Sequence, residues 1–213
     1  MKYLKKYIII TILLILYILV YSIAYANSTI SNLSNNLFRL HVIANSNSET
    51  DQNLKYKVRD SLISYMNDIC KNASTKQEAI CIANTHIKEF TKIAQNTIKK
   101  NGFNYKVKVT IGNYPFPTKT YGDISLPAGY YDALKVEIGE AKGKNWWCVM
   151  FPPLCFVDVS SGIVPDESKN TIKASLSNEE EYILVNEEKN ADLKIKFKLI
   201  EFFQNVKIQT AQK

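Results

Sequence analysis

The sequence predicts an α+β fold: one domain in which a mostly antiparallel sheet packs against a helical hairpin, after an N-terminal apolar helix. Three observations support this prediction: an apolar run near the N-terminus, two stretches with apolar residues at helical spacing, and several stretches of strict apolar–polar alternation. The chain has 213 residues, of which 46% are hydrophobic. This composition is typical of a globular protein with a single core.

Residues 1–26 read as a signal peptide or signal anchor. Three lysines precede an apolar run that begins at Tyr7, and the sequence AYA at residues 24–26 resembles a signal-peptidase site. The run approaches the ~20 residues that span a bilayer, so cleavage and anchoring both stay open. We expect a short flexible stem at residues 27–37 and an exported domain at residues 38–213.

Two helices are expected next, and each has its own start signal. Ser48 and Asp51 form a capping pair, and apolar residues at spacings of three and four predict a helix over residues 51–69. A second capping box begins at Thr75 and opens another apolar stripe. The stripe ends at residues 101–102, where Asn-Gly supplies a left-handed cap. The two helices form the predicted hairpin.

Strands are expected on both sides of the helical hairpin. Residues 38–45 predict a strand that is covered on both faces, whereas residues 105–111 and 134–138 alternate as half-buried strands do. Residues 114–129 are rich in turn formers. Residues 193–208 begin with strand-like alternation and end in a pattern that also suits a helix. The strand order does not follow from the sequence.

Charge and motifs exclude several function classes. The net charge of +7 falls to +4 without the three lysines of residues 1–26, and the remaining lysines are dispersed, so a nucleic-acid partner is not expected. The chain has two histidines and lacks the common metal, phosphate-loop and serine-nucleophile motifs. We therefore expect no enzyme activity, no cofactor and no metal.

Four cysteines in an exported chain favour disulfides. A helical hairpin brings the ends of its helices together, so a Cys70–Cys81 bridge is geometrically plausible. A Cys148–Cys155 bridge requires a loose turn around the two prolines between them, because directly opposed residues suit a bridge best. Two buried free thiols are the alternative for this second pair.

The sequence GKNWWCVMFPPLCFVD at residues 143–158 places two tryptophans side by side. Adjacent strand residues point to opposite faces of a sheet, so Trp146 and Trp147 cannot both enter one core. Either both sides of this strand are covered, or one indole is exposed. An exposed tryptophan beside Phe and Met is typical of an interface anchor.

Two long stretches resemble the stage II sporulation protein R family of endospore-forming bacteria. They are FRLHVIANSNSETDQNLKYKVRDSL at residues 38–62 and TKTYGDISLPAGYYDALKVEIGEAKGKNWWCVMFPPLCFVD at residues 118–158. The resemblance implies a protein exported from the forespore into the intermembrane space, secreted or held there by residues 1–26 if these are uncleaved. It further implies that the chain activates a membrane-embedded mother-cell protease that processes the sigma-E precursor.

An activator of this kind requires a contact surface, and we expect it in two places. The first is the corner between the first strand and the first helix, with Arg39, His41, Asn45, Ser48, Asp51 and Arg59. The second is the aromatic stretch, with Trp146, Trp147, Phe151, Pro152 and Pro153.

Other interpretations of these residues stay open. Turn and cap chemistry is the alternative for Asn45, Ser48 and Asp51, and a salt bridge to an acid such as Asp158 is the alternative for Arg39. A wall-associated enzyme or a wall-binding module of the intermembrane space is the alternative function.

Overall fold

The computed structural model describes residues 2–121 and 124–153, and it confirms an α+β fold with an N-terminal apolar helix. The predicted element at residues 193–208 lies outside the described residues. In chain order the elements are α1 (Lys2–Asn36), β1 (Phe38–Ile43), α2 (Glu49–Ile69), α3 (Lys76–Thr85), α4 (Ile87–Lys100), β2 (Val107–Phe116), β3 (Lys119–Tyr121), β4 (Ile124–Leu126), β5 (Gly129–Ile138) and β6 (Asn145–Phe151).

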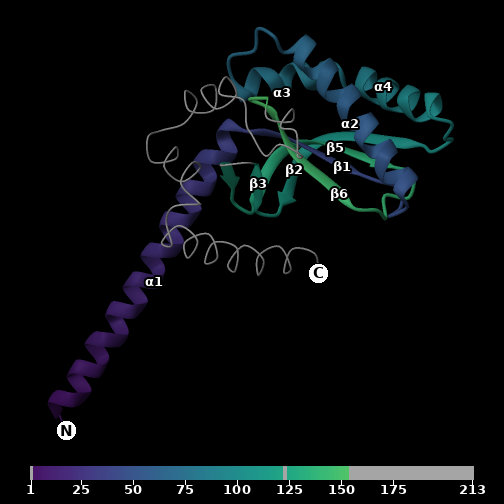
Figure 1. Cartoon of the computed structure of the whole chain (residues 1–213). Coiled ribbons are helices and arrows are strands. Elements are labelled where there is room, and N and C mark those ends of the chain that lie inside the picture. The colour runs from purple at the N-terminus through teal and green to yellow at the C-terminus, as the bar shows by residue number, and fades with distance from the viewer. Residues whose placement is uncertain (1, 122–123, 154–213) are drawn as a thin grey trace.

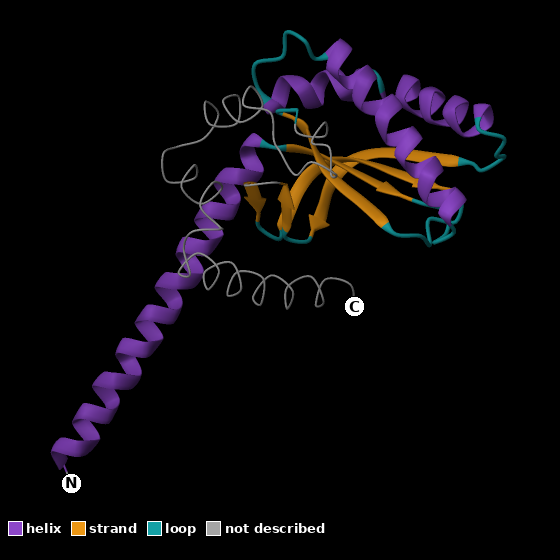
Figure 2. Cartoon of the chain, viewed as in Figure 1, coloured by secondary structure: helices purple, strands orange, loops and turns teal. Residues whose placement is uncertain are grey.

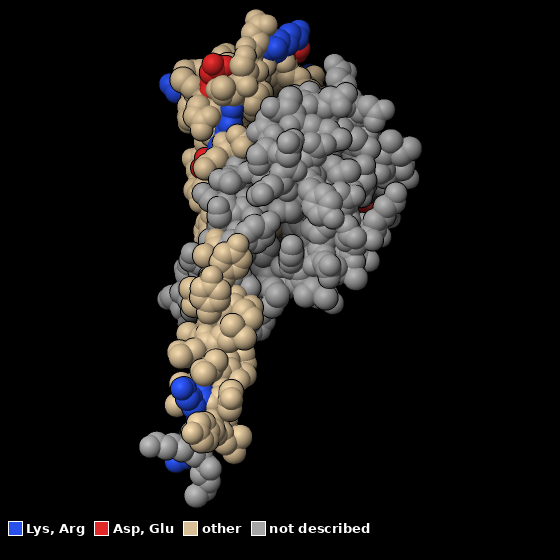
Figure 3. Space-filling model, turned by 90° about the vertical axis from the view of Figure 1, so that its left-hand side faces the viewer, with Lys and Arg blue, Asp and Glu red and all other residues tan. Residues whose placement is uncertain are grey.

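Helix α1 projects away from the sheet as a long rod (Figure 1). Its segment Tyr3–Tyr21 is long and apolar enough to cross a membrane, and none of it is buried inside the structure. In the space-filling view, blue basic groups appear only near the N-terminal end of this rod (Figure 3). The helix continues through residues 27–36, where the sequence predicted a flexible stem. No proline or glycine occurs in this segment to interrupt it.

The main sheet has four strands in the order β2-β5-β1-β6. Strand β1 pairs in parallel with β5, whereas the β1–β6 and β2–β5 pairs are antiparallel. Helices α2, α3 and α4 carry the chain from β1 to β2 at the edge of the sheet, and β5 then returns antiparallel to β2, so that it lies parallel to β1. The predicted mostly antiparallel sheet is therefore confirmed, with its parallel contact at the centre.

Helices α2, α3 and α4 cover the upper face of the sheet (Figure 2). Leu40, Val42 and Val136 are fully buried in the core on this side. The helices contribute Leu54, Val58, Leu62, Met66, Phe90, Ala94 and Ile98 to the same core. The second predicted helix is divided into α3 and α4 at His86, whose backbone leaves the helical region (φ −101°, ψ 11°).

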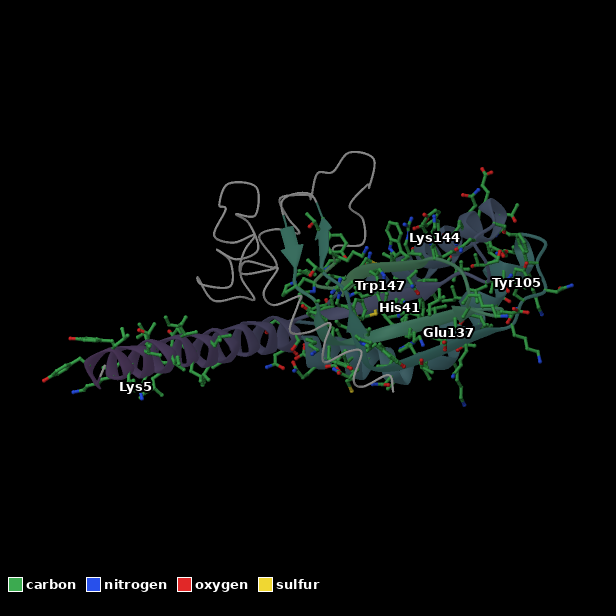
Figure 4. The ribbon with its side chains drawn as sticks, turned by 90° about the horizontal axis from the view of Figure 1, so that it is seen from below. Lys5, His41, Tyr105, Glu137, Lys144 and Trp147 are labelled. Carbon is green, nitrogen blue, oxygen red and sulfur yellow. The ribbon has the colours of Figure 1, made fainter. Side chains whose placement is uncertain are left out.

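The opposite, lower face of the sheet carries a second and smaller core. Leu37, Phe116, Leu126, Tyr131 and Val149 are buried there. The β3–β4 pair forms a separate two-stranded sheet. It lies below one end of the main sheet in Figure 1. Figure 4 views this face from below and labels His41 and Trp147.

Two loops at the end of β1 hold each other in place. The backbone N–H groups of Lys142 and Gly143 donate to the carbonyls of Asn45 and Ala44, at 3.1 and 2.9 Å. The Asn45 side chain accepts a hydrogen bond from the backbone N–H of Glu140 at 3.0 Å. These bonds connect the β1–α2 loop to the β5–β6 loop, and so they fix where α2 starts relative to β6.

We predict that Gly139→Ala destabilises the protein by roughly 2 kcal/mol or more in the free energy of unfolding. Gly139 has a φ of +59°, and an added Cβ would overlap Oδ1 of Asn45. Asn45 cannot move freely, because its amide also donates to Asp51. Urea denaturation of the purified variant measures the loss.

The matched control is Gly102→Ala. Gly102 also has a positive φ, +82°, but a Cβ there meets nothing within 4 Å. This variant carries only the left-handed strain, about 1 kcal/mol. Equal losses in Gly139→Ala and Gly102→Ala would show that the contact with Asn45 does not constrain the loop.

Candidate partner-binding site

Strand β6 places the two tryptophans on opposite faces of the sheet, as their adjacency requires. Trp146 is paired with Val42 and points toward the helices, whereas Trp147 is paired with His41 and points to the lower face. Each indole is half-buried. Both faces are therefore partly covered at this position, and each tryptophan keeps an exposed part.

Trp146 forms an aromatic–cationic cluster with helix α2. The guanidinium carbon of Arg59 lies 4.3 Å from the centre of the Trp146 ring and 5.1 Å from that of Tyr56. Tyr56 meets Trp146 edge to face at 5.3 Å. We call these three residues the Tyr56–Arg59–Trp146 cluster. It brings together one residue from each predicted contact region, and Trp, Tyr and Arg are the residue types enriched at binding hot spots.

The cluster lies beside a buried lysine. Lys55 donates to Oε1 of Gln52 at 2.6 Å and to the backbone carbonyl of Lys144 at 3.1 Å. Burial lowers the pKa of Lys55 to about 8, and the charges of Arg59 and Lys144 act in the same direction. Lys55 thus joins the start of α2 to the residue before β6, and its Nζ lies 4.8 Å from the centre of the Tyr56 ring.

Asn45, Ser48 and Asp51 form the internal hydrogen bonds of the corner. Ser48 caps α2 by accepting from the backbone N–H of Asp51 at 3.2 Å. The buried Asp51 carboxylate accepts from Asn45 at 2.8 Å and from Ser46 at 2.6 Å. Burial alone would raise the pKa of Asp51, but these hydrogen bonds outweigh burial and lower it. The turn and cap alternative therefore describes what these side chains do in the structure.

His41 lies on the lower face, stacked on Trp147 with 3.6 Å between the ring centres (Figure 4). Its Nε2 is 2.8 Å from Oδ1 of Asn145. Because this amide oxygen can only accept, Nε2 carries the proton of the neutral ring. The remaining nitrogen, Nδ1, is buried without a hydrogen-bond partner. Burial lowers the pKa of His41 from 6.5 to about 4, and the hydrogen bond with Asn145 opposes this only in part.

The other predicted contact residues are mostly interior. Arg39 is fully buried, so it forms no surface contact in this conformation. Asp158 lies outside the described residues, and its pairing with Arg39 stays a prediction. Phe151 is half-buried and paired with Phe38. Of the two prolines that follow, Pro152 is buried, and Pro153 is half-buried.

The structure contradicts one of the two predicted disulfide bridges. Cys70 and Cys81 are both free, so the structure contains no 70–81 bridge. The sulfur of Cys70 points along α2 to Met66, 3.7 Å away, whereas Cys81 is exposed on α3. Cys148 is buried and disulfide-bonded. Cys155 lies outside the described residues, and the 148–155 pairing stays a prediction.

Sequence reasoning missed two residues that shape these sites. Tyr56 is three residues before Arg59 on α2, so helical spacing placed it on the same face and gave a usable signal. Tyr121 comes from the turn-rich stretch before β5, and the sequence of this stretch gave no signal for its contacts. Its hydroxyl accepts from Arg39 at 2.9 Å and donates to the carbonyl of Trp147 at 2.9 Å.

We predict that the protein loses stability as the pH falls from about 6.5 to about 4. In this window the unfolded chain binds a proton at His41 that the folded protein does not bind, so protonation favours unfolding. A pKa lowered to about 4 corresponds to a loss on the order of 3 kcal/mol across the window. Urea denaturation at a series of pH values measures it.

His41→Phe keeps an aromatic ring against Trp147 and is expected to flatten this dependence. His86→Gln removes the other histidine of the chain and serves as the matched control. Asp51 does not interfere, because its lowered pKa costs stability only as the pH falls below about 3.8. A slope that survives in His41→Phe but disappears in His86→Gln would contradict the assignment.

Comparison with known proteins agrees with the motifs. The family model for stage II sporulation protein R matches residues 34–161, which contain the four-stranded sheet and helices α2, α3 and α4. The stage II sporulation protein R of Bacillus subtilis (strain 168) is 35% identical over 183 residues, covering 79% of this chain and 80% of that protein. No solved structure matches the chain. The chain therefore belongs to the stage II sporulation protein R family, a family of sporulation proteins.

Proposed function

We propose that the chain is an exported signalling protein that activates the membrane-embedded protease responsible for processing the sigma-E precursor during endospore formation. Family membership supports a role in sporulation. The apolar segment Tyr3–Tyr21 fits a signal or anchor that directs the domain across a membrane. In this proposal the chain acts by binding, in the space between the two sporulation membranes, and the protease supplies the chemistry.

The Tyr56–Arg59–Trp146 cluster is the observation that carries the proposed contact surface. The Nε of Arg59 donates to the Asp60 carboxylate at 2.7 Å. Within the described residues, no hydrogen bond or ion pair involves Nη1 or Nη2 of Arg59. The planar guanidinium is stacked on Trp146 and its side chain is 17% exposed, so it is held in place for a partner. A pre-positioned arginine loses little freedom on binding, which favours affinity.

Activation also imposes a thermodynamic requirement. A ligand shifts a two-state enzyme only by binding its active state more tightly than its inactive state. Moving the equilibrium from 1:99 to 99:1 requires a difference of about 5.5 kcal/mol. Two or three hot-spot side chains supply a difference of this size. We propose that Arg59 and Trp146 contact a surface that is complete only in the active state of the protease.

Reconstitution in a non-sporulating bacterium tests the proposed function. Residues 1–213 are co-expressed with the candidate membrane protease and the sigma-E precursor, and precursor size is followed on a gel. We expect cleavage that depends on this chain. Deleting residues 1–26 should abolish it, because the domain then stays on the cytoplasmic side. Full cleavage by the deleted form would contradict action across the membrane.

We further predict that Trp146→Ala and Arg59→Ala each reduce precursor cleavage roughly 30-fold or more, as the loss of a hot-spot residue does. Arg59→Lys should recover little, because an ammonium group keeps the charge but loses the planar stack on Trp146. The amount of exported protein is measured in parallel. A variant that disappears from the exported fraction has lost its fold, and its activity is then not counted.

Two control variants match these changes. Phe103→Ala removes a half-buried aromatic ring that stacks on Tyr105 at 5.3 Å, in the segment that leads into β2, the edge strand opposite β6. Lys92→Ala removes a basic side chain from the exposed surface of α4. Both are expected to retain cleavage. A loss in these controls equal to that in Trp146→Ala would mean that general destabilisation, and not the cluster, determines activity.

A further inference from the structure

The segment Tyr3–Tyr21 of α1 is an apolar surface that the rest of the described chain leaves uncovered (Figure 1). Its large apolar side chains are exposed, from 46% at Leu19 to 79% at Tyr3. After Lys6, the next charged residue of the chain is Arg39. An exposed apolar surface of this extent requires an apolar cover.

The dimensions of the segment match a lipid bilayer. It has 19 residues, and an α-helix of this length extends about 28 Å, close to the ~30 Å of the hydrocarbon core. Tyr3 and Tyr7 lie at one end, and Tyr17 and Tyr21 lie at the other. Tyrosine is enriched at both interfaces of a membrane. The chain thus places aromatic rings where the two interfaces would lie, with the lysines at the cytoplasmic end.

A second copy of α1 suits this surface less well than lipid does. Helices associate within membranes through small residues, or through polar side chains that form hydrogen bonds between helices. Residues 3–21 contain no Gly, Ala or Ser. Their one threonine, Thr11, donates to the carbonyl of Tyr7 in the same helix at 2.9 Å. These residues therefore favour lipid as the cover.

The backbone of α1 continues past the sequence AYA of residues 24–26. It stays helical to Asn36, and β1 begins at Phe38. Proteolysis concentrates at exposed loop tips and chain ends, and a site inside a continuous helix offers neither. The 19-residue apolar segment is also longer than the ~7–15 residues of the apolar core of a signal peptide. Both features favour retention of the segment over its removal.

Lys76, the first residue of α3, joins the C-terminal end of α1 to the sheet. Its Nζ donates to the backbone carbonyl of Ser34 at 2.6 Å and forms an ion pair with Asp132 of β5 at 2.7 Å. The side chain of Lys76 is only 6% exposed. Carbonyls in the last turn of a helix lack partners within the helix, and a cation there also opposes the negative end of the helix dipole. Asn113 of β2 donates to the same Asp132 carboxylate at 3.1 Å.

We propose that α1 is retained as a lipid-embedded anchor, and that Lys76 clamps the C-terminal end of this anchor to the exported domain. Residues 22–36 extend about 22 Å as a helix, so α1 holds the domain no farther than this from the hydrocarbon core. The inference goes beyond the proposed function, which a cleaved signal peptide would serve equally well. It does not rest on that function, and its test requires no protease.

Retention is tested by expressing the full chain with a C-terminal tag in a non-sporulating bacterium. A membrane-impermeant maleimide should label the exposed thiol of Cys81 in intact spheroplasts, which shows that the domain is exported. Membranes are then washed with alkaline carbonate, which removes proteins that are not embedded. We expect the labelled chain to stay in the membrane at full length, and to be a monomer when it is extracted in mild detergent with a reductant.

Three results would overturn the anchor. The first is a labelled product that co-migrates with a size marker consisting of residues 27–213. The second is the absence of Cys81 labelling, which would place the domain in the cytoplasm. The third is a dimer in the reduced detergent extract, which would make a second copy, and not lipid, the cover of α1.

The clamp is tested by amide hydrogen exchange of the full chain in lipid nanodiscs. A helix as short as residues 27–36 is not stable alone in water, so slow exchange there requires that it be held at both ends. Lys76→Met removes a charge-assisted hydrogen bond and should speed exchange of residues 27–36 roughly tenfold or more. Unchanged exchange in α2 would show that the domain stays folded. Lys92→Ala, on the exposed surface of α4, is the matched control and should exchange as the wild type does.

Asp132→Asn serves as a second variant if Lys76→Met does not fold. It keeps Lys76 and removes only the ion pair, so it should speed exchange of residues 27–36 by a smaller factor. The clamp is overturned if residues 27–36 exchange rapidly in the wild type, or if they stay equally protected in both variants.

Discussion

The position of β1 between β5 and β6 is the constraint on which the other features depend. Because β1 is paired on both edges and covered on both faces, its alternate residues enter two different environments. Leu40 and Val42 pack under the helices, whereas Arg39 and His41 are forced to the lower face. The alternation within this six-residue strand thus buries the guanidinium of Arg39 and the imidazole of His41.

The same arrangement explains why Arg59 meets Trp146. Strand β6 runs antiparallel to β1, so Asn145 at its start is paired with Ile43 at the end of β1. Helix α2 begins a few residues after Ile43, and the loop bonds between the two segments fix its starting point. The first turns of α2 therefore pass over the first residues of β6. Asn45 and Asp51 help to position the helix that carries Arg59.

Much of the fold followed from sequence patterns, and the parts that did not have physical reasons. Helix α2, its Ser48 cap and the Gly102 terminus were predictable because their signals are local. The break at His86 was not, because the apolar stripe continues through it. The Arg59–Trp146 contact joins residues far apart in sequence, and it required the strand order, which the sequence does not contain. The free state of Cys70 depends on side-chain direction along α2, which the idea of a helical hairpin does not specify.

Strand β6 connects the two faces of the sheet physically. On the lower face, Arg39 donates a hydrogen bond to the carbonyl of Cys148, and the Tyr121 hydroxyl donates one to the carbonyl of Trp147. On the upper face, Trp146 stacks under Arg59. A displacement of this backbone on the lower face therefore moves the indole on the upper face, because one peptide unit joins the two tryptophans. Coupling between the faces requires that β6 have two stable positions.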